Sequence, residues 1–353
     1  MITRGRFLTR RAAALALALC ACSGPARAQW TPLPSPTNVS LRGLSVVDAR
    51  TVWASGAKGT VVHSVDGGNS WRLDTIPGAS AFDLRSIHAR DSRVAHVAAT
   101  AGRIWRTTDA GATWSLRYQA ADTSVFLDAV DFWDDRHGIA LGDPIGGRFF
   151  LLVTDDGGDT WREPPVASRP VALEGEAAFA ASGSSLALQG TGDSMVAWIG
   201  SGGRSARLHR SLPHLSGWTA YETPMRQGGA AEGIFSIAIL PTGGLFLVGG
   251  NYSQDDSARA NAATSVTGAE WSTRIAVPPR GYRSGVAFAS TPAYRAVGLA
   301  VGPGGSDRSR DGGVTWLAFD RAGYHAVRAT RDAIFFASGS EGRLARFDAR
   351  PTR

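Results

Sequence analysis

Ser64-Val-Asp66-Gly-Gly68-Asn-Ser70-Trp71 is the first of four copies of one eight-residue pattern, Ser/Thr-x-Asp-x-Gly-x-Ser/Thr-Trp. The other copies occupy residues 107–114, 154–161 and 309–316. Aspartate and glycine at these positions are typical of a tight turn, because a carboxylate accepts hydrogen bonds from its own backbone and glycine tolerates a positive φ. The tryptophan is a large apolar anchor for the strand that follows. Repetition of such a unit along the chain predicts a repeat architecture.

The tryptophan that ends each octet gives the length of the repeat. Two degenerate copies, which keep only part of the pattern and end at Trp218 and Trp271, lie between the third and fourth octets. The six tryptophans are then spaced by 43 to 57 residues, the length of one four-stranded propeller blade. A seventh unit without an octet lies at residues 335–345, and residues 29–33 resemble an outer strand without its hairpin. We therefore predict an all-β fold, a single seven-bladed β-propeller of four-stranded antiparallel blades over residues 29–353, closed by the N-terminal strand.

The first 28 residues have the composition of an export signal. A group of arginines precedes the apolar stretch Ala12–Ala21, which is too short to cross a bilayer, and Ala26-Arg-Ala28 is a cleavage pattern. Leu19-Cys20-Ala21-Cys22 gives a competing interpretation, a lipobox that would leave a lipidated Cys22 as a membrane anchor. Both interpretations predict an exported bacterial protein, either free in the periplasm or tethered to the envelope.

The composition of residues 29–353 argues against several classes of function. Both cysteines lie in the signal segment, so residues 29–353 contain no thiol nucleophile and no cysteine metal ligand. Without the five arginines of the signal segment the formal charge falls from +7 to +2, and nucleic-acid binding is not indicated. The sequence has no flavin or nicotinamide fingerprint and no haem or copper ligand cluster, so an oxidoreductase label has no support in the residues. We expect neither a cofactor nor a metal.

The candidate site comes from the starts of the inner strands. In a propeller these strands line a central channel, and the residues that begin them converge on its mouth. Aligning the seven predicted inner strands gives a column in which six of seven residues are ionisable. The column is Arg42, Arg85, Asp128, Glu176, Phe235, Arg283 and His325, with Tyr282 and Tyr324 beside it. Turns between second and third strands add Lys58, Arg103, Asp143, Arg148, Arg204, Asn251, Tyr252, Asp307 and Glu341 to the rim.

This ring of charges has two interpretations. Arginines can hold an anionic group, and carboxylates with aromatic rings can bind a peptide. The same charges can instead form an ion-pair network around a water-filled channel. The octets lie on the opposite, peripheral side, so we expect a purely structural role for their residues: Asp66, Trp71, Asp109, Trp114, Asp156, Trp161, Asp311 and Trp316.

The octet is the Asp-box, also called the BNR repeat, which sialidases and many other β-propellers contain. With the Val-Gly-x-x-Gly-like turn before it, the repeat resembles the photosystem II stability/assembly-factor family and its bacterial relatives, from Trp30 to Asp348. The resemblance implies an exported seven-bladed propeller that binds protein partners through an arginine patch. Arg42, Arg85 and Arg283 correspond to that patch by column position. The photosystem partner does not transfer, because the resemblance does not require a phototrophic source.

A sialidase-like glycoside hydrolase is the alternative. That chemistry needs three arginines around a carboxylate, a tyrosine nucleophile with a glutamate, and an acid/base aspartate. The column offers these types in Arg42, Arg85, Arg283, Tyr282 or Tyr324, Glu176 and Asp128. The Arg-Ile-Pro motif of sialidases is absent, and sialidases have six blades. We therefore predict a non-catalytic propeller that binds a protein partner or a small anionic ligand at its channel mouth, without nucleic acid, and that meets a membrane only through an N-terminal lipid.

Overall fold

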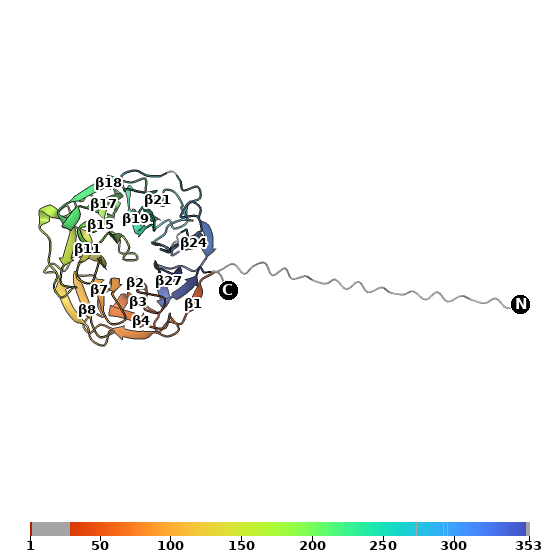
Figure 1. Ribbon diagram of the computed structural model, residues 1–353, viewed down its shortest axis with the longest axis horizontal. Helices are drawn as coiled ribbons and strands as arrows, with labels where there is room; N and C mark the ends of the chain where they lie inside the picture. The colour runs from red at the N-terminus through yellow and green to blue at the C-terminus, as the bar shows by residue number, and fades with distance from the viewer. Residues whose placement is uncertain (2–28, 273, 292, 295, 351–353) are drawn as a thin grey trace.

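The computed structural model describes Met1 and residues 29–272, 274–291, 293–294 and 296–350, so the predicted export signal and lipobox lie outside the described residues. Short antiparallel sheets succeed one another around a central axis, from β2 near the start of the chain to β27 near its end (Figure 1). The prediction of a seven-bladed β-propeller is confirmed. Among the described residues, no helix has the length and apolar character needed to cross a membrane.

Five blades contain four antiparallel strands each. In the first, second, fourth and sixth blades the strands run in chain order from the channel outward. Their bounds are β2 (Leu41–Val46), β3 (Val52–Gly56), β4 (Thr60–Ser64) and β5 (Arg72–Thr75); β6 (Leu84–Ala89), β7 (Ala95–Ala99), β8 (Arg103–Thr107) and β9 (Ser115–Gln119); β14 (Leu186–Gln189), β15 (Val196–Gly200), β17 (Arg207–Ser211) and β18 (Trp218–Glu222); and β22 (Gly285–Phe288), β23 (Gly298–Gly302), β24 (Gly305–Ser309) and β25 (Leu317–Asp320).

The seventh blade combines the two ends of the chain. It contains β26 (Ala326–Ala329), β27 (Ile334–Ser338) and β28 (Leu344–Asp348), with β1 (Thr31–Leu33) paired to β28 in the outer position. Trp30, next to β1, is 5% exposed and packs against Phe319, Tyr324 and Phe347, with ring centroids 5.7, 5.4 and 6.3 Å away. Its indole N–H donates to Ser306 Oγ at 3.0 Å. The N-terminal segment is thus anchored between the sixth and seventh blades.

The third and fifth blades have irregular outer strands. The third contains β10 (Leu127–Phe132), β11 (Gly138–Ile145) and β12 (Arg148–Thr154), and its outer position is reduced to single bridges at Arg162 and Val171. The prolines of that segment lack the N–H that a regular ladder requires. The fifth contains β19 (Gly229–Ile239), β20 (Leu245–Asn251) and β21 (Ala262–Ser265), with one bridge to Trp271 outside. One-turn 3₁₀ segments lie at η1 (Ala57–Gly59), η2 (Val166–Ser168), η3 (Gly192–Ser194), η4 (Pro213–Leu215) and η5 (Ser340–Gly342).

The four octets form one repeated turn. Asp66 accepts hydrogen bonds from the backbone N–H of Ser70 at 2.9 Å, from its hydroxyl at 2.6 Å and from the Ser64 hydroxyl at 2.8 Å. The same bonds recur at Asp109, Asp156 and Asp311. These bonds, with that of the Ser70 hydroxyl first, lower the pKa of Asp66 to about 2. The octet carboxylates are therefore occupied in holding their own hairpins.

Residues 178–184, which we call the channel plug, enter the centre of the ring; Figure 1 shows a loop beside β15 that reaches inward. The Ser182 hydroxyl donates to Ser284 O of the sixth blade at 2.7 Å, and Ser184 donates to Ser236 of the fifth at 2.7 Å. Gly183 has a φ of +67°, and a Cβ there would lie 2.5 Å from Ser86 Oγ of the second blade. The run of alanine, serine and glycine fits because larger side chains would collide with the inner strands.

Because of the plug, the predicted start of one inner strand is wrong. The inner strand of the fourth blade was expected to begin after Glu176, but β14 begins ten residues later, at Leu186. Glu176 instead lies in the two-residue strand β13 (Glu176–Ala177), which pairs with β16 (Gly202–Gly203). The apolar run Ala177–Ala181 has the composition of a strand, but the small residues after it favour the close approach of a loop to the channel walls.

Candidate functional site

A cavity of about 350 Å³ opens at one end of the channel, which we call the upper mouth. Five of the predicted residues line it: Arg42, Arg85, Tyr252, Tyr282 and His325. They come from the first, second, fifth, sixth and seventh blades, so the ring brings together residues up to 283 positions apart in the chain. Phe235 of the column lines the cavity as well, together with Phe179 of the plug and Pro303. The fold therefore places these residues around one cavity at the end of the channel.

One wall of the cavity is aromatic. Phe179 stacks on Phe235, with ring centroids 3.9 Å apart and planes inclined by 14°. Tyr282 meets the edge of Phe235 at 4.7 Å, and Tyr252 closes the group at 6.1 Å from Phe235. Tyr252 is 51% exposed, so its ring borders the solvent, whereas burial raises the pKa of Tyr282 and keeps its hydroxyl neutral. This wall offers flat apolar surface to a ligand.

Two arginines, Arg42 and Arg85, make part of the cavity lining cationic. Arg42 has no hydrogen-bond or ion-pair partner among the described residues, and burial, followed by the charge of Arg85, lowers its pKa. Arg85 Nε lies 2.9 Å from Asp83 Oδ2, and its guanidinium lies 5.3 Å from the Phe126 ring centroid. One of the two guanidinium groups is thus paired within the protein, and the other is available to an anion.

His325 lines the cavity together with the two arginines, but its side chain is neutral. Its Nε2 lies 3.1 Å from Ser40 Oγ and 2.9 Å from Ser340 Oγ. Burial lowers the pKa of His325 to about 3, and the charges of Arg42 and Arg85 act in the same direction. At neutral pH the imidazole therefore shapes the cavity without adding a third positive charge.

Asp128 lies behind the upper mouth rather than in it. Its side chain is buried, and its Oδ2 has no hydrogen-bond partner among the described residues. Burial raises the pKa of Asp128 well above its ordinary value, and the nearby carboxylate of Asp143 adds to the effect. Asp143 itself accepts the Ala178 N–H at 3.1 Å, at the start of the plug. The column placed Asp128 at the channel mouth, but its carboxyl group is buried and does not line the cavity.

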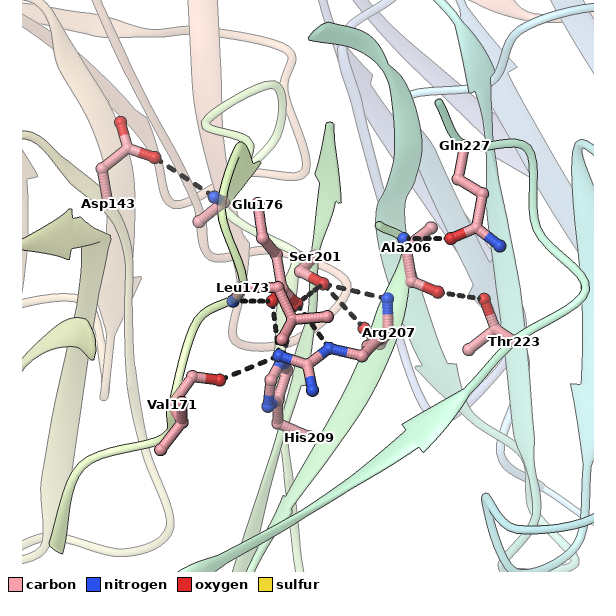
Figure 2. Close-up of polar contacts among 11 residues, drawn as sticks. Asp143, Val171, Leu173, Glu176, Ser201, Ala206, Arg207, His209, Thr223 and Gln227 are labelled. Carbon is pink, nitrogen blue, oxygen red and sulfur yellow. Dashed lines mark hydrogen bonds and ion pairs between the residues drawn. The ribbon is translucent and has the colours of Figure 1, made fainter. Parts of the chain in front are cut away.

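Glu176 belongs to a buried ion-pair cluster in the fourth blade, away from the cavity (Figure 2). Arg207 donates from Nη2 to Oε2 at 2.5 Å, and His209 Nε2 lies 2.9 Å from Oε1. The Ser201 hydroxyl and the Leu173 N–H also donate to the carboxylate, at 2.5 and 2.8 Å. Burial alone would raise the pKa of Glu176, but these bonds outweigh it and lower the pKa to about 2. The cluster fixes the backbone two residues before the plug.

The sequence alignment was off by one residue at Arg283. Ser284 lies one residue before β22, at the column level, whereas Arg283 turns into the sixth blade and pairs with Asp307 at 2.6 Å. Both side chains are almost completely buried, at 3% and 0% exposed. A guanidinium finds its carboxylate within the blade because a buried charge without one is costly. Neither Arg283 nor Asp307 can therefore meet a ligand at the upper mouth.

The other predicted residues also lie outside the cavity. Tyr324 is 2% exposed and belongs to the core around Trp30. Arg148 donates to the Arg169 carbonyl at 2.6 Å, and Asn251 donates to Glu232 at 3.1 Å. Arg204 is exposed and lies 3.5 Å from Glu174. The six groups required for sialidase chemistry do not line one cavity, since Arg42, Arg85 and Tyr282 line the upper mouth whereas Glu176, Asp128 and Arg283 do not.

Comparisons with known proteins agree with the architecture. No protein family and no curated protein matches the sequence. Among solved structures, one described as YCF48 bound to D1 peptide has a TM-score of 0.62 at 17% identity, covering 93% of this chain and all of the other. YCF48 from Cyanidioschyzon merolae has a TM-score of 0.59 at 19% identity, covering 91% and 99% of the two chains. A streptogramin B lyase structure has a TM-score of 0.63 at 12% identity, covering 90% and 96%. These similarities show the fold, which is shared by a protein that holds a peptide and by an enzyme.

Proposed function

We propose that the protein is an exported, non-catalytic propeller that binds a protein partner at its upper mouth through an anionic group. The observation that carries the proposal is that one open cavity holds both the Arg42 guanidinium, which has no partner among the described residues, and the aromatic wall of Phe179, Phe235 and Tyr252. A guanidinium binds carboxylates in fork geometry, and tyrosine and arginine are the residue types most enriched at binding hot spots. A similar structure that holds a peptide supports a protein as the partner.

The anionic group would enter beside Arg42 because Arg85 is already paired with Asp83. An apolar or aromatic side chain of the partner would lie on Tyr252, the half-exposed edge of the wall. A folded domain cannot enter a cavity of about 350 Å³, so the bound segment is a chain end or a protruding loop.

Partner capture tests the proposal. Full-length protein with an in-frame affinity tag is cross-linked in its host envelope, and captured proteins are compared between wild type, Arg42→Glu and Arg204→Glu. Arg204 is the matched control because it lies outside the cavity and its side chain is 68% exposed. We expect Arg42→Glu to reduce specific partners about tenfold or more, as loss of a hot-spot arginine does, and Arg204→Glu to leave them unchanged. Equal partner sets for all three proteins would refute the site.

Enzymatic turnover would refute the proposal that the propeller is non-catalytic. Purified protein is assayed with a fluorogenic sialoside, and we expect no release of the fluorophore above the buffer rate. Turnover that Tyr282→Phe abolishes would instead support the glycosidase alternative.

A further inference from the structure

A second cavity, of about 210 Å³, lies at the opposite end of the channel, which we call the lower mouth. Its polar lining residues are each three positions after a member of the upper column: Ser45, His88, Asp131 and Arg328. They come from β2, β6, β10 and β26. Gly183 of the plug lines this cavity, whereas Ala180 and Ala181 line the upper one. The plug therefore separates two cavities of different composition.

Arg328 brings a positive charge to the lower mouth that no carboxylate of the described residues contacts. Its Nη1 donates to Val327 O at 3.1 Å, and its Nη2 crosses to Ser182 O of the plug at 3.3 Å. Both acceptors are neutral carbonyls, and no carboxylate oxygen of the described residues lies within 4.0 Å of the guanidinium. Burial lowers the pKa of Arg328, and the more distant charge of Asp131 opposes this shift. A guanidinium keeps its proton even so, which leaves a half-buried cation without a contacting counter-ion among the described residues.

His88 and Asp131 form the other polar side of this cavity. His88 Nδ1 lies 2.7 Å from Asp131 Oδ1, which also accepts the Phe132 N–H at 2.9 Å. The carboxylate favours the tautomer with a proton on Nδ1, so that Nε2 offers a lone pair. Ser45 Oγ accepts the Ala89 N–H at 2.9 Å, which leaves its own hydroxyl proton to donate. The cavity thus combines the Arg328 cation and the Asp131 carboxylate with an imidazole acceptor and a hydroxyl donor.

We propose that the lower mouth binds a small hydroxycarboxylate, whose carboxylate pairs with Arg328 and whose hydroxyl donates to His88. The planar guanidinium fork matches a carboxylate. Asp131 places a negative charge in the same cavity, although more than 4.0 Å from the guanidinium, and this charge disfavours a dianion such as phosphate. The volume of about 210 Å³ is below the range of drug-sized ligand sites and admits only a small molecule. The carboxylate of the ligand would contact the guanidinium directly, which no carboxylate of the described residues does.

Glycolate, acetate and inorganic phosphate are the probes, and the imidazole resonances of His88 report binding by NMR. We expect glycolate to bind more tightly than acetate, and phosphate to bind least. Arg328→Met should weaken glycolate about tenfold or more, the usual loss for a hydrogen bond to a charged group. Arg90→Met is the matched control, because Arg90 follows His88 by two residues, is 41% exposed and pairs with Asp91. Arg42→Met, at the upper mouth, should also leave glycolate binding unchanged.

Two results would overturn the proposal: no glycolate-dependent change at His88, or the same loss in Arg328→Met and Arg90→Met. If Arg328→Met fails to fold, Asp131→Asn decides, because it keeps Arg328 and removes the competing negative charge. Acetate, which needs only the guanidinium, should then bind more tightly than to wild type. Unchanged or weaker acetate binding to Asp131→Asn would contradict the assignment.

Discussion

Replacing Glu176 by glutamine should destabilise the protein and loosen the channel plug. The carboxylate is completely buried and accepts bonds from Arg207, His209, Ser201 and Leu173, so glutamine removes the charge but keeps the volume. The amide leaves the Arg207 guanidinium, with 10% of its side chain exposed, without a carboxylate. Breaking one side of a buried ion pair costs about 3–5 kcal/mol. At an unfolding entropy of about 2.1 cal/mol/K per residue, a propeller of this length loses about 1.5 °C in Tm per kcal/mol, so we expect a fall of about 4–7 °C.

The assay is thermal and urea unfolding followed by circular dichroism, with Glu174→Gln as the matched control. Glu174 lies two residues away, but its carboxylate is 91% exposed and its pair with Arg204 spans 3.5 Å at the surface. An exposed pair of this kind contributes about 0–1 kcal/mol. Hydrogen exchange of the amides in residues 178–184 reports the plug itself, and we expect faster exchange in Glu176→Gln only. Equal stability of the two variants, or an unchanged plug, would refute the argument that the cluster anchors this loop.

Three further predictions concern the turns, the pH dependence and the N-terminal anchor. Gly313→Ala should cost more stability than Gly312→Ala. Both glycines have a positive φ, but only a Cβ at position 313 would lie 2.5 Å from the Phe246 ring. In urea unfolding we expect a loss of about 1–2 kcal/mol from φ in both variants and a further 1–3 kcal/mol from the overlap in Gly313→Ala. Burial and the neighbouring charge of His88 lower the pKa of His96 to about 3 from 6.5, so below pH 6.5 the unfolded chain binds a proton that the folded chain does not, and stability falls with acid. His96→Gln should reduce the loss between pH 7 and 5 by about 2 kcal/mol, at about 1.4 kcal/mol per pH unit, and equal slopes for the two proteins would contradict the shift. Trp30→Ala should cost about 3–5 kcal/mol in the same assay, and a loss below about 1 kcal/mol would show that β1 does not stabilise the seventh blade.

The fold was predictable because its information is local and repeated. Each octet specifies its own hairpin through contacts within a few residues, as the bonds of Asp66 to Ser64 and Ser70 show. The upper mouth was predictable in part for the same reason, since Arg42 and Arg85 occupy equivalent positions in regular blades.

The remaining errors at the site come from partners that are distant in the sequence. Glu176 pairs with Arg207 and His209, and an alignment of short apolar runs carries no information about such pairs. The plug interrupts the period before the fourth blade, so that alignment took its first residues for a strand. Phe179, which lines the cavity from the plug, had no equivalent in the other blades and gave no periodic signal.

The pairing of β1 with β28 sets an order of events for folding. In their register Leu33 pairs with Leu344, 311 residues further along the chain, and the two strands complete one sheet. During synthesis the N-terminal strand is made first and its partner last, so the ring stays open until nearly the whole chain is available. Closing so long a segment carries the largest loop entropy in the molecule and belongs to the slow, non-local class of contacts. Until that step, β28 exposes an unpaired outer edge to other chains.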